Sequence, residues 1–459
     1  MKIYFDDGRC GDGKTFAQLT KMAQTKGKYI LAMDKIDLIE QRKTELRALC
    51  SLAGSHPVID AINSDISTNV SADVEAICDD QYPHQIIMIT HTAMKNARFS
   101  SAFADWHLII DEDFSVLTSK DWSLTVATDL VNTEFDFMAT DKPDVFKMVP
   151  TSDIDQLVHS DVLSDDLKEL REMAGRHDVY TDQPEAKAER LRWWSVWDFK
   201  RLDAFASVTV LANAFTEKLS YKLASLNCIE FERIERVGQR HWSSRPVVIR
   251  YFSEKSGSKT YFDSAEAMTD LAKIRSWQAK HFSGLEYWSA NTTTASKLRL
   301  QGHQIKPLAA GRNDLQDHSV CTFIYSARSS SVEDHTLKAI SCGKLSGDLI
   351  IRDREQEAIG QFILRGSLRK PDDQSTVEIR LFSKDQAEFA RDFLVRNGYV
   401  EASDIMLDHV DLGLKIAERK TKGRPKLVLS EAELEARAIE KREKERLKKQ
   451  RQRAAQRLA

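Results

Sequence analysis

The sequence predicts an α/β protein with two tandem parallel-sheet domains, a mostly helical insertion in the first domain and a basic C-terminal helix. Two observations predict the sheets. Short, apolar, β-prone segments alternate with segments of helical periodicity over residues 1–113, and the alternation returns from about residue 245 to 398. A third observation predicts the additions: residues from about 114 to 206 have few clean strand patterns, and the sequence after residue 400 is dominated by charge.

The first domain is expected over residues 1–222. Residues 1–6 (MKIYFD) are apolar and β-prone, and the helical pattern at 15–27 closes on Gly27, which is a helix stop signal. The further elements expected are strands at 28–33, 85–90, 106–111 and 207–215, a helix at 36–54 and a helix-like stretch at 73–81. The strand at 207–215 follows the insertion and is expected to complete the first sheet.

The insertion at about 114–206 is rich in Asp and Trp. We expect it to be mostly helical and to lie between two strands of the first sheet. Trp193 and Trp194 are expected to be core or domain-interface residues, since large aromatic side chains are usually buried.

The second domain is expected over residues 223–400. Its predicted strands are 246–252, 284–290, 318–327 and 375–382, and its predicted helices are 264–282, 292–302, 353–370 and 384–398. Residues 401–459 are expected to form a basic linker and a charged helical tail. The capping-box pattern Ser430-x-x-Glu433 begins that helix, and from Arg437 onward it has ten basic and three acidic residues.

The composition is typical of a soluble globular protein. Hydrophobic residues make up 42% of the 459 residues, and no segment approaches the roughly 18 consecutive apolar residues of a membrane helix. The first residues lack the apolar core of a signal peptide, and the six cysteines are scattered without zinc-ligand spacing. We therefore expect a cytoplasmic protein without a membrane partner, in the host cytoplasm if a phage encodes it.

The segment Gly8-x-x-x-x-Gly13-Lys14-Thr15 matches the phosphate-loop pattern G-x-x-x-x-G-K-[ST]. It lies between a predicted strand and a predicted helix, which is the context that such a loop requires. Gly8, Gly11 and Gly13 let backbone N–H groups point at an anion, and the helix adds its N-terminal dipole. Lys14 is expected to reach the phosphates of ATP, and the Thr15 hydroxyl is expected to bind Mg²⁺.

An acidic cluster, Asp111-Glu112-Asp113, follows the predicted strand at 106–111. A phosphate loop requires an acidic partner for Mg²⁺ at the end of another strand. Asp111 is expected to hold the metal ion through water, and Glu112 to polarise the attacking water. Asp113 either assists them or couples to the second domain.

With these two motifs in place, the chain resembles the superfamily 2 helicases and translocases over about residues 1–400. That family has two RecA-like domains, with ATP in the cleft between them and nucleic acid across both. The resemblance implies that Gln361, Arg365 and Arg369, in the segment QFILRGSLR, complete the ATP site from the second domain, with Arg365 as the arginine finger. Arg369 follows Arg365 by four residues, whereas three is usual in the family.

Other segments resemble weaker motifs of the family. Residues 32–42 and 89–92 resemble segments that contact nucleic acid. Residues 311–314, with Asn313, resemble a second-domain loop that senses nucleotide. Residues 211–214 (LANA) take the place of the Ser-Ala-Thr coupling motif but lack its hydroxyl groups.

These motifs predict an ATP-dependent helicase or translocase that uses ATP and Mg²⁺ and acts on nucleic acid, DNA rather than RNA. The segment KGRPK at 422–426 resembles an AT-hook core, and the basic helix after it can lie along phosphates. The compact layout suggests a phage- or plasmid-type protein of replication or recombination, with proteins of those processes as partners.

Two alternatives stay open. A viral DNA-packaging motor also begins with an ATPase domain, but its nuclease domain needs clustered carboxylates, and residues 245–400 show no convincing acidic triad at strand ends. A DNA-binding replication factor that holds ATP as a switch would not translocate, and the altered segment at 212–214 is the best support for it.

Overall fold

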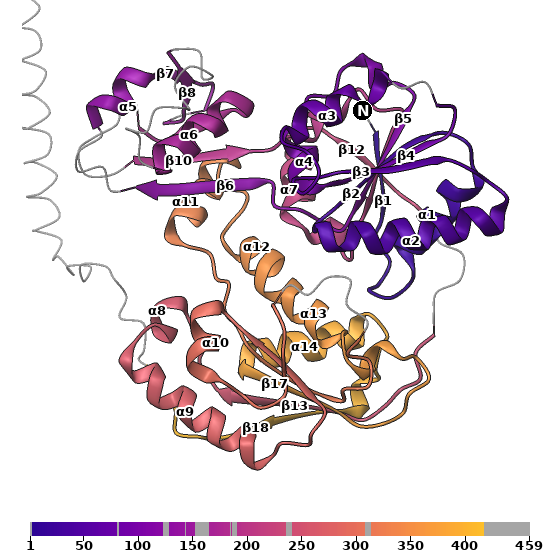
Figure 1. Ribbon diagram of the computed structural model, residues 1–459. Coiled ribbons are helices and arrows are strands. Elements are labelled where there is room, and N and C mark those ends of the chain that lie inside the picture. The colour runs from indigo at the N-terminus through magenta and orange to yellow at the C-terminus, as the bar shows by residue number, and fades with distance from the viewer. Residues whose placement is uncertain are drawn as a thin grey trace, which may run out of the picture. The chain divides into compact units, whose positions relative to one another are not determined.

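The computed structural model describes residues 2–79, 82–122, 128–142, 144–151, 165–183, 185, 191–235, 241–307 and 314–416 (Figure 1). The chain divides into two units, Met1–Lys415 and Ile416–Ala459. The predicted AT-hook-like segment and charged tail belong to the second unit and lie outside the described residues. Three β-sheets organise the first unit, and two of them are parallel. The predicted pair of parallel-sheet α/β domains is therefore confirmed. Within the described ranges, no helix combines the length and apolar character needed to cross a membrane.

The first sheet has seven parallel strands in the order β12-β1-β11-β5-β2-β4-β3. The strands are β1 (Lys2–Asp6), β2 (Lys28–Met33), β3 (Val58–Ile62), β4 (Gln85–Thr90), β5 (Trp106–Asp111), β11 (Ser207–Leu211) and β12 (Glu230–Arg233). The helices that accompany it are α1 (Lys14–Gln24), α2 (Ile36–Ala53), α3 (Val70–Ala76), α4 (His91–Asn96) and α7 (Leu219–Leu226). As predicted, the strand after the insertion joins this sheet, between β1 and β5.

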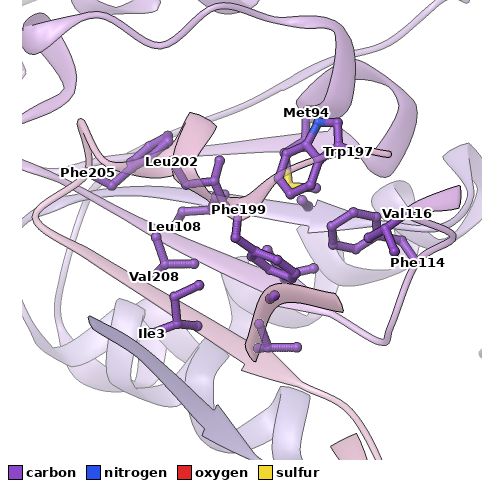
Figure 2. Close-up of a cluster of buried hydrophobic side chains, with 14 of the residues drawn as sticks. Ile3, Met94, Leu108, Phe114, Val116, Trp197, Phe199, Leu202, Phe205 and Val208 are labelled. Atoms are coloured by element: carbon purple, nitrogen blue, oxygen red, sulfur yellow. The ribbon is translucent and has the colours of Figure 1, made fainter. Parts of the chain in front are cut away.

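Helices cover both faces of the first sheet because alternate residues of a strand point to opposite faces. In β2, Leu31 packs in a buried cluster with residues of α1 and α2, whereas Ile30 packs in a second cluster with residues of α3, α4 and α7. Figure 2 shows part of the second cluster, from Ile3 of β1 to Phe199 and Trp197. Strands buried on both faces read as continuous apolar runs, which is why the sequence predicted them.

The prediction of a mostly helical insertion is wrong, because the described residues between 117 and 196 include a five-stranded antiparallel sheet in the order β6-β10-β9-β8-β7. Its strands are β6 (Leu117–Trp122), β7 (Phe135–Ala139), β8 (Phe146–Pro150), β9 (Val179–Thr181) and β10 (Leu191–Val196), and its helices are α5 (Thr128–Glu134) and α6 (Asp165–Arg176). Antiparallel strands need apolar residues only on their buried face, so they lack the long apolar runs that identify a parallel strand.

The two tryptophans of β10 show how the insertion is attached. Trp193 packs in the insertion's own core with Trp122 and Leu170. Its neighbour Trp194 points to the other face and packs in the main cluster of the first sheet. Both side chains are fully buried, which confirms the prediction that they are core residues.

The second parallel sheet has six strands in the order β15-β14-β16-β17-β13-β18. The strands are β13 (Val247–Ser253), β14 (Glu286–Ala290), β15 (His303–Gln304), β16 (Val320–Ile324), β17 (Val377–Ser383) and β18 (Ile405–His409). The helices are α8 (Lys259–Phe262), α9 (Ala265–Lys280), α10 (Thr292–Leu298), α11 (Ser331–Ile340), α12 (Asp348–Ile351), α13 (Glu357–Ile363) and α14 (Lys384–Arg396).

Two edge strands lie beyond the domain limits that the sequence predicts. β12 pairs with β1 although the second domain was expected from residue 223, and β18 pairs with β13 although that domain was expected to end at residue 400. Neither strand has a fully buried residue. Because edge strands of this kind lack an apolar run, the sequence gives no signal for them.

The helix predicted over residues 353–370 is wrong in its second half, because α13 ends at Ile363. The chain turns where Gly366 lies against the carbonyl group of His318, and a Cβ atom at Gly366 would be 2.6 Å from that oxygen. Arg365 therefore follows the helix, and Arg369 lies in a 3₁₀ turn (Ser367–Arg369).

Helix α11 belongs to the second half of the described chain (residues 241–416) and packs on the first half (residues 2–235). It lies beside β6 of the insertion (Figure 1), and its Leu337 is fully buried in the main cluster of the first sheet. Ile350 of α12 belongs to the same cluster. The two halves therefore share part of one hydrophobic core.

We expect Leu337→Ala to lower the free energy of unfolding by about 2–5 kcal/mol, because the substitution leaves a cavity in a shared core. Leu52→Ala is the matched control, since Leu52 is 86% exposed and Leu337 is 0% exposed. Urea unfolding followed by tryptophan fluorescence measures both variants. Equal transition midpoints for Leu337→Ala and the wild type would show that the contact is not part of the core.

Candidate functional site

A cleft of about 650 Å³ lies between the carboxyl end of the first sheet and helix α13 of the second half. Its volume is within the range of roughly 300–1,000 Å³ that is typical of ligand sites. Of the predicted site residues, those that line it are Gly11, Gly13, Lys14, Thr15, Asp111, Glu112, Gln361, Arg365 and Arg369. Gly8 lies in the same loop, and Asn313 lies outside the described residues.

The glycine-rich loop joins β1 to α1. The backbone N–H of Gly8 donates to Asp6 Oδ1 at 3.0 Å, which begins the turn. Gly13 has φ +75° and nothing within 4 Å of the position that a Cβ would take, so its left-handed backbone, rather than lack of space, requires glycine. Lys14 Nζ donates to the carbonyl oxygens of Gly8 at 2.6 Å and Arg9 at 3.1 Å.

Asp111 is the last residue of β5, and Thr15 is the second residue of α1. The Thr15 hydroxyl donates to Asp111 Oδ1 at 2.7 Å. Parallel pairing of β1 with β11 and of β11 with β5 brings the ends of these strands to one edge of the sheet. Burial raises the pKa of Asp111, and the hydrogen bond from Thr15 opposes that rise.

Glu112 has an unusual backbone conformation. Its φ is +72°, in the left-handed region, and its N–H donates to the carbonyl of Leu211 at 3.0 Å. Left-handed conformations of this kind cost about 1–3 kcal/mol and concentrate at functional sites. Burial, with a smaller effect of the Asp111 charge, raises the pKa of Glu112 to about 7.

The predicted residues of the second half face these groups. Gln361 Nε2 donates to Glu112 Oε2 at 3.4 Å, which links the two halves directly. Arg365 is only 6% exposed, and its Nε has no hydrogen-bond partner among the described residues. Arg369 is half-buried; burial, followed by the charge of Arg365, lowers its pKa.

A charge cluster lies beside these residues, in which Lys218 is buried and its acidic neighbours are half-buried. Lys218, just before α7, donates to Glu357 Oε2 of α13 at 2.5 Å. Burial lowers the pKa of Lys218, but the charges of Glu357, Asp113 and Asp353 outweigh it, so the pKa is raised overall. Asp113 belongs to the acidic cluster that the sequence shows, whereas Lys218, Asp353 and Glu357 match no local pattern, and only the fold brings them together.

Asp113 and Asp353 also take part in contacts at this interface. The Ser220 hydroxyl donates to Asp113 Oδ1 at 2.5 Å, and burial raises the pKa of Asp113 to about 6. The two carboxylate oxygens of Asp353 accept from the backbone N–H of Leu219 at 3.1 and 3.0 Å.

The glycine-rich loop itself contacts the second half. Arg9 Nη1 donates to the carbonyl of Asn397 at 2.7 Å, and its guanidinium carbon lies 4.8 Å from the centroid of a Trp242 ring. The Tyr399 hydroxyl donates to the carbonyl of Cys10 at 2.8 Å. Because these contacts hold the middle of the loop, we expect a movement of the second half to move the loop as well.

The segments with weaker family resemblance also reach the cleft. Arg42, Thr92 and Asn213 line it, one from each of the segments 32–42, 89–92 and 211–214. His91 is buried, and burial lowers its pKa to about 4, so it is neutral at physiological pH. Residues 308–313, which include most of the predicted nucleotide-sensing loop, lie outside the described residues.

No protein-family model matches the sequence, and no curated protein matches it. Solved structures do resemble it in fold. An XPD helicase is 10% identical with a TM-score of 0.48, and the match covers 89% of this chain and 96% of that one. Dbp5 of S. cerevisiae bound to RNA and ADP-BeF3 is 10% identical with a TM-score of 0.40, covering 89% and 85%. The DUF1998 helicase MrfA bound to DNA and AMPPNP is 10% identical with a TM-score of 0.35, covering 86% and 48%.

The interface between the halves is expected to weaken as pH rises. Burial, followed by the Asp113 charge, raises the pKa of Asp353 to about 7, above its unfolded value of about 3.9. The folded state therefore binds more protons between these values, and the free energy of unfolding falls as pH rises from about 4 to 7. Asp353→Asn keeps an acceptor for the Leu219 N–H and should reduce this slope.

Urea unfolding at a series of pH values measures the slope. Asp317→Asn is the control, because a hydrogen bond from Lys370 lowers the pKa of Asp317 in the folded state, and an unfolded Asp titrates near about 3.9, so this carboxylate is ionised in both states over most of the range. The same slope in Asp353→Asn and the wild type would contradict the prediction.

Proposed function

We propose that this chain is an ATP-hydrolysing helicase or translocase of the superfamily 2 type, acting on nucleic acid and on DNA rather than RNA. The observation that carries the proposal is that one cleft joins Lys14 and Glu112 of the first half to Gln361 and Arg365 of the second. Superfamily 2 proteins hydrolyse ATP at a cleft of this composition.

The first half supplies groups that suit a triphosphate. Gly8, Gly11 and Gly13 lie in a loop whose N–H groups precede the N-terminus of α1, and such loops favour phosphate oxygens. Lys14 Nζ donates to two carbonyl oxygens of the loop, and with ATP bound it would donate to phosphate oxygens instead. The resemblance adds Asn313 as a further nucleotide contact.

Thr15 and Asp111 would hold Mg²⁺, because their hydroxyl and carboxylate oxygens lie 2.7 Å apart and oxygen ligands suit this ion. Bound there, Mg²⁺ would neutralise charge on the phosphate oxygens. Glu112 would orient the attacking water, as its half-buried carboxylate lies next to Asp111 and faces the second half.

The second half would complete the reaction site. Charge that develops on the transferred phosphoryl group requires a cationic donor, and the Arg365 guanidinium is buried with a free Nε–H among the described residues. Gln361 would help to hold the water, and Arg369 would add a second cationic group to the cleft. Hydrolysis would then depend on contact between the halves.

We expect single-stranded or double-stranded DNA to stimulate ATP hydrolysis more than RNA does. Lys14→Ala should lose ATP binding, because the phosphates lose their main cationic partner. Arg365→Ala should keep ATP binding but lower turnover by about 10³-fold or more, the usual effect of removing an arginine finger. A coupled ATPase assay and a fluorescent-nucleotide titration measure the two effects.

Arg391→Ala serves as the control, since this arginine pairs with Asp392 on the surface of α14. ATP binding with negligible turnover that is insensitive to Arg365 would instead indicate a non-translocating switch. Metal-dependent nicking of DNA would indicate a packaging motor.

Truncation after Lys415 is expected to weaken DNA binding, because it removes the basic residues of the tail and keeps β18. The loss should be greatest at low salt, since contacts with phosphates release counterions. Fluorescence anisotropy with labelled DNA at several salt concentrations measures it. Unchanged affinity would exclude the tail from DNA binding.

A further inference from the structure

We propose that Glu357 is a positioning residue that orients the side-chain amide of Gln361 toward Glu112, and that Lys218 holds Glu357 in place for this task. The proposal rests on the ATPase function proposed above. It assigns Lys218 and Glu357 a role in hydrolysis that neither the motifs nor the sequence patterns give them.

A chain of three contacts crosses the interface twice. Lys218 of the first half donates to Glu357 Oε2 at 2.5 Å. Glu357 Oε1 accepts from Gln361 Nε2 at 3.0 Å, one turn further along α13. The same Nε2 donates to Glu112 Oε2 of the first half at 3.4 Å.

The ionised carboxylate of Glu357 favours one orientation of the Gln361 amide. An ionised carboxylate only accepts hydrogen bonds, whereas a glutamine side chain has an NH₂ group with two donors and an oxygen that only accepts. Because Gln361 lies between two carboxyl groups, its NH₂ group faces both and its oxygen faces away from them. Although burial alone would raise the pKa of Glu357, the Lys218 charge lowers it overall and keeps Glu357 ionised.

The orientation depends on contact between the halves. Lys218 is 6% exposed and comes from the segment after β11, whereas Glu357 begins α13 of the second half. When the halves separate, Glu357 loses Lys218 and Gln361 loses Glu112. The amide is therefore set for hydrolysis only while the cleft is closed around the substrate.

Stability alone is a weak reason for this ion pair. Replacing a buried ion pair by apolar residues of similar size is often neutral or stabilising, because desolvation offsets the attraction between the charges. An apolar pair would join the halves equally well, but it would leave the Gln361 amide free to rotate. Orientation of that amide is what the charged pair adds.

The test exchanges the two charges in the full-length protein. In Lys218→Glu/Glu357→Lys the ion pair is kept, but the lysine at position 357 is a donor and turns the Gln361 oxygen toward itself. We expect the KM for ATP to stay near the wild-type value, whereas the thermal unfolding midpoint should fall, because the new carboxylate at position 218 faces Asp113 and Asp353. The kcat should fall about tenfold, the effect of losing one hydrogen bond to a charged group in the transition state.

A second variant, Lys218→Met/Glu357→Leu, removes both charges and should fold even if the exchanged pair does not. It should show the same fall in kcat at unchanged KM. Adding Gln361→Leu to either double variant should lower kcat no further, whereas the same change in the wild type should lower it about tenfold. Non-additivity of this kind distinguishes orientation of Gln361 from a general effect on the interface.

The control exchanges another ion pair between the halves. Arg396 and Glu217 pair at 3.4 Å with exposed side chains, so Glu217→Arg/Arg396→Glu should leave both kcat and KM unchanged. Wild-type kcat in either Lys218/Glu357 double variant would overturn the proposal and leave the ATPase function intact. Absence of ATP hydrolysis by the wild-type protein would overturn the proposed function and this inference together.

Discussion

The buried Lys218 and the half-buried carboxylates that surround it between the two halves are the constraint on which the rest of the structure depends. Lys218 of the first half lies among the carboxylates of Asp353 and Glu357 of the second. A buried charge without a partner costs several kcal/mol, so each half needs the other to compensate the charges that it brings to the interface. Because of this requirement, α13 packs against the carboxyl end of the first sheet. Gln361 lies in α13 and Arg365 follows it, so the position of α13 determines where both side chains lie.

The topology of the first sheet explains why this edge can serve as a site. All seven strands run parallel, so the loops after β1, β5 and β11 emerge at one edge and bring Lys14, Asp111 and Asn213 to the same cleft. The shared core around Leu337 lies on α11 and gives the halves a second contact, which is mainly apolar, although Lys142 also donates to the carbonyl of Ile340 there. Apolar packing therefore joins the halves, while the charged contacts determine which groups meet in the cleft.

The sequence predicts the features of this site that depend on neighbouring residues. The roles of Gly13, Lys14 and Thr15 were predictable because a strand, a glycine-rich loop and a helix follow one another in the sequence. Asp111 was predictable because it ends an apolar strand, and that pattern also involves only neighbouring residues. The left-handed backbone of Glu112, the turn at Gly366 that ends α13 early, and the position of Lys218 all depend on residues more than 40 positions away. The insertion sheet was missed for a different reason, because alternating strands resemble short helices when each has only three to six residues.

The altered segment at 211–214 shows how the interface can work without hydroxyl groups. In the family that the sequence resembles, a Ser-Ala-Thr motif at this place links hydrolysis to strand movement. Here Ala212 and Asn213 line the cleft, and the contacts to the second half come a few residues later, from the Lys218 side chain and the Leu219 backbone. An ion pair acts over longer distances than a hydroxyl hydrogen bond and is little screened when buried. As the halves approach, the attraction between Lys218 and Glu357 can therefore draw α13 inward before the Gln361 amide contacts Glu112.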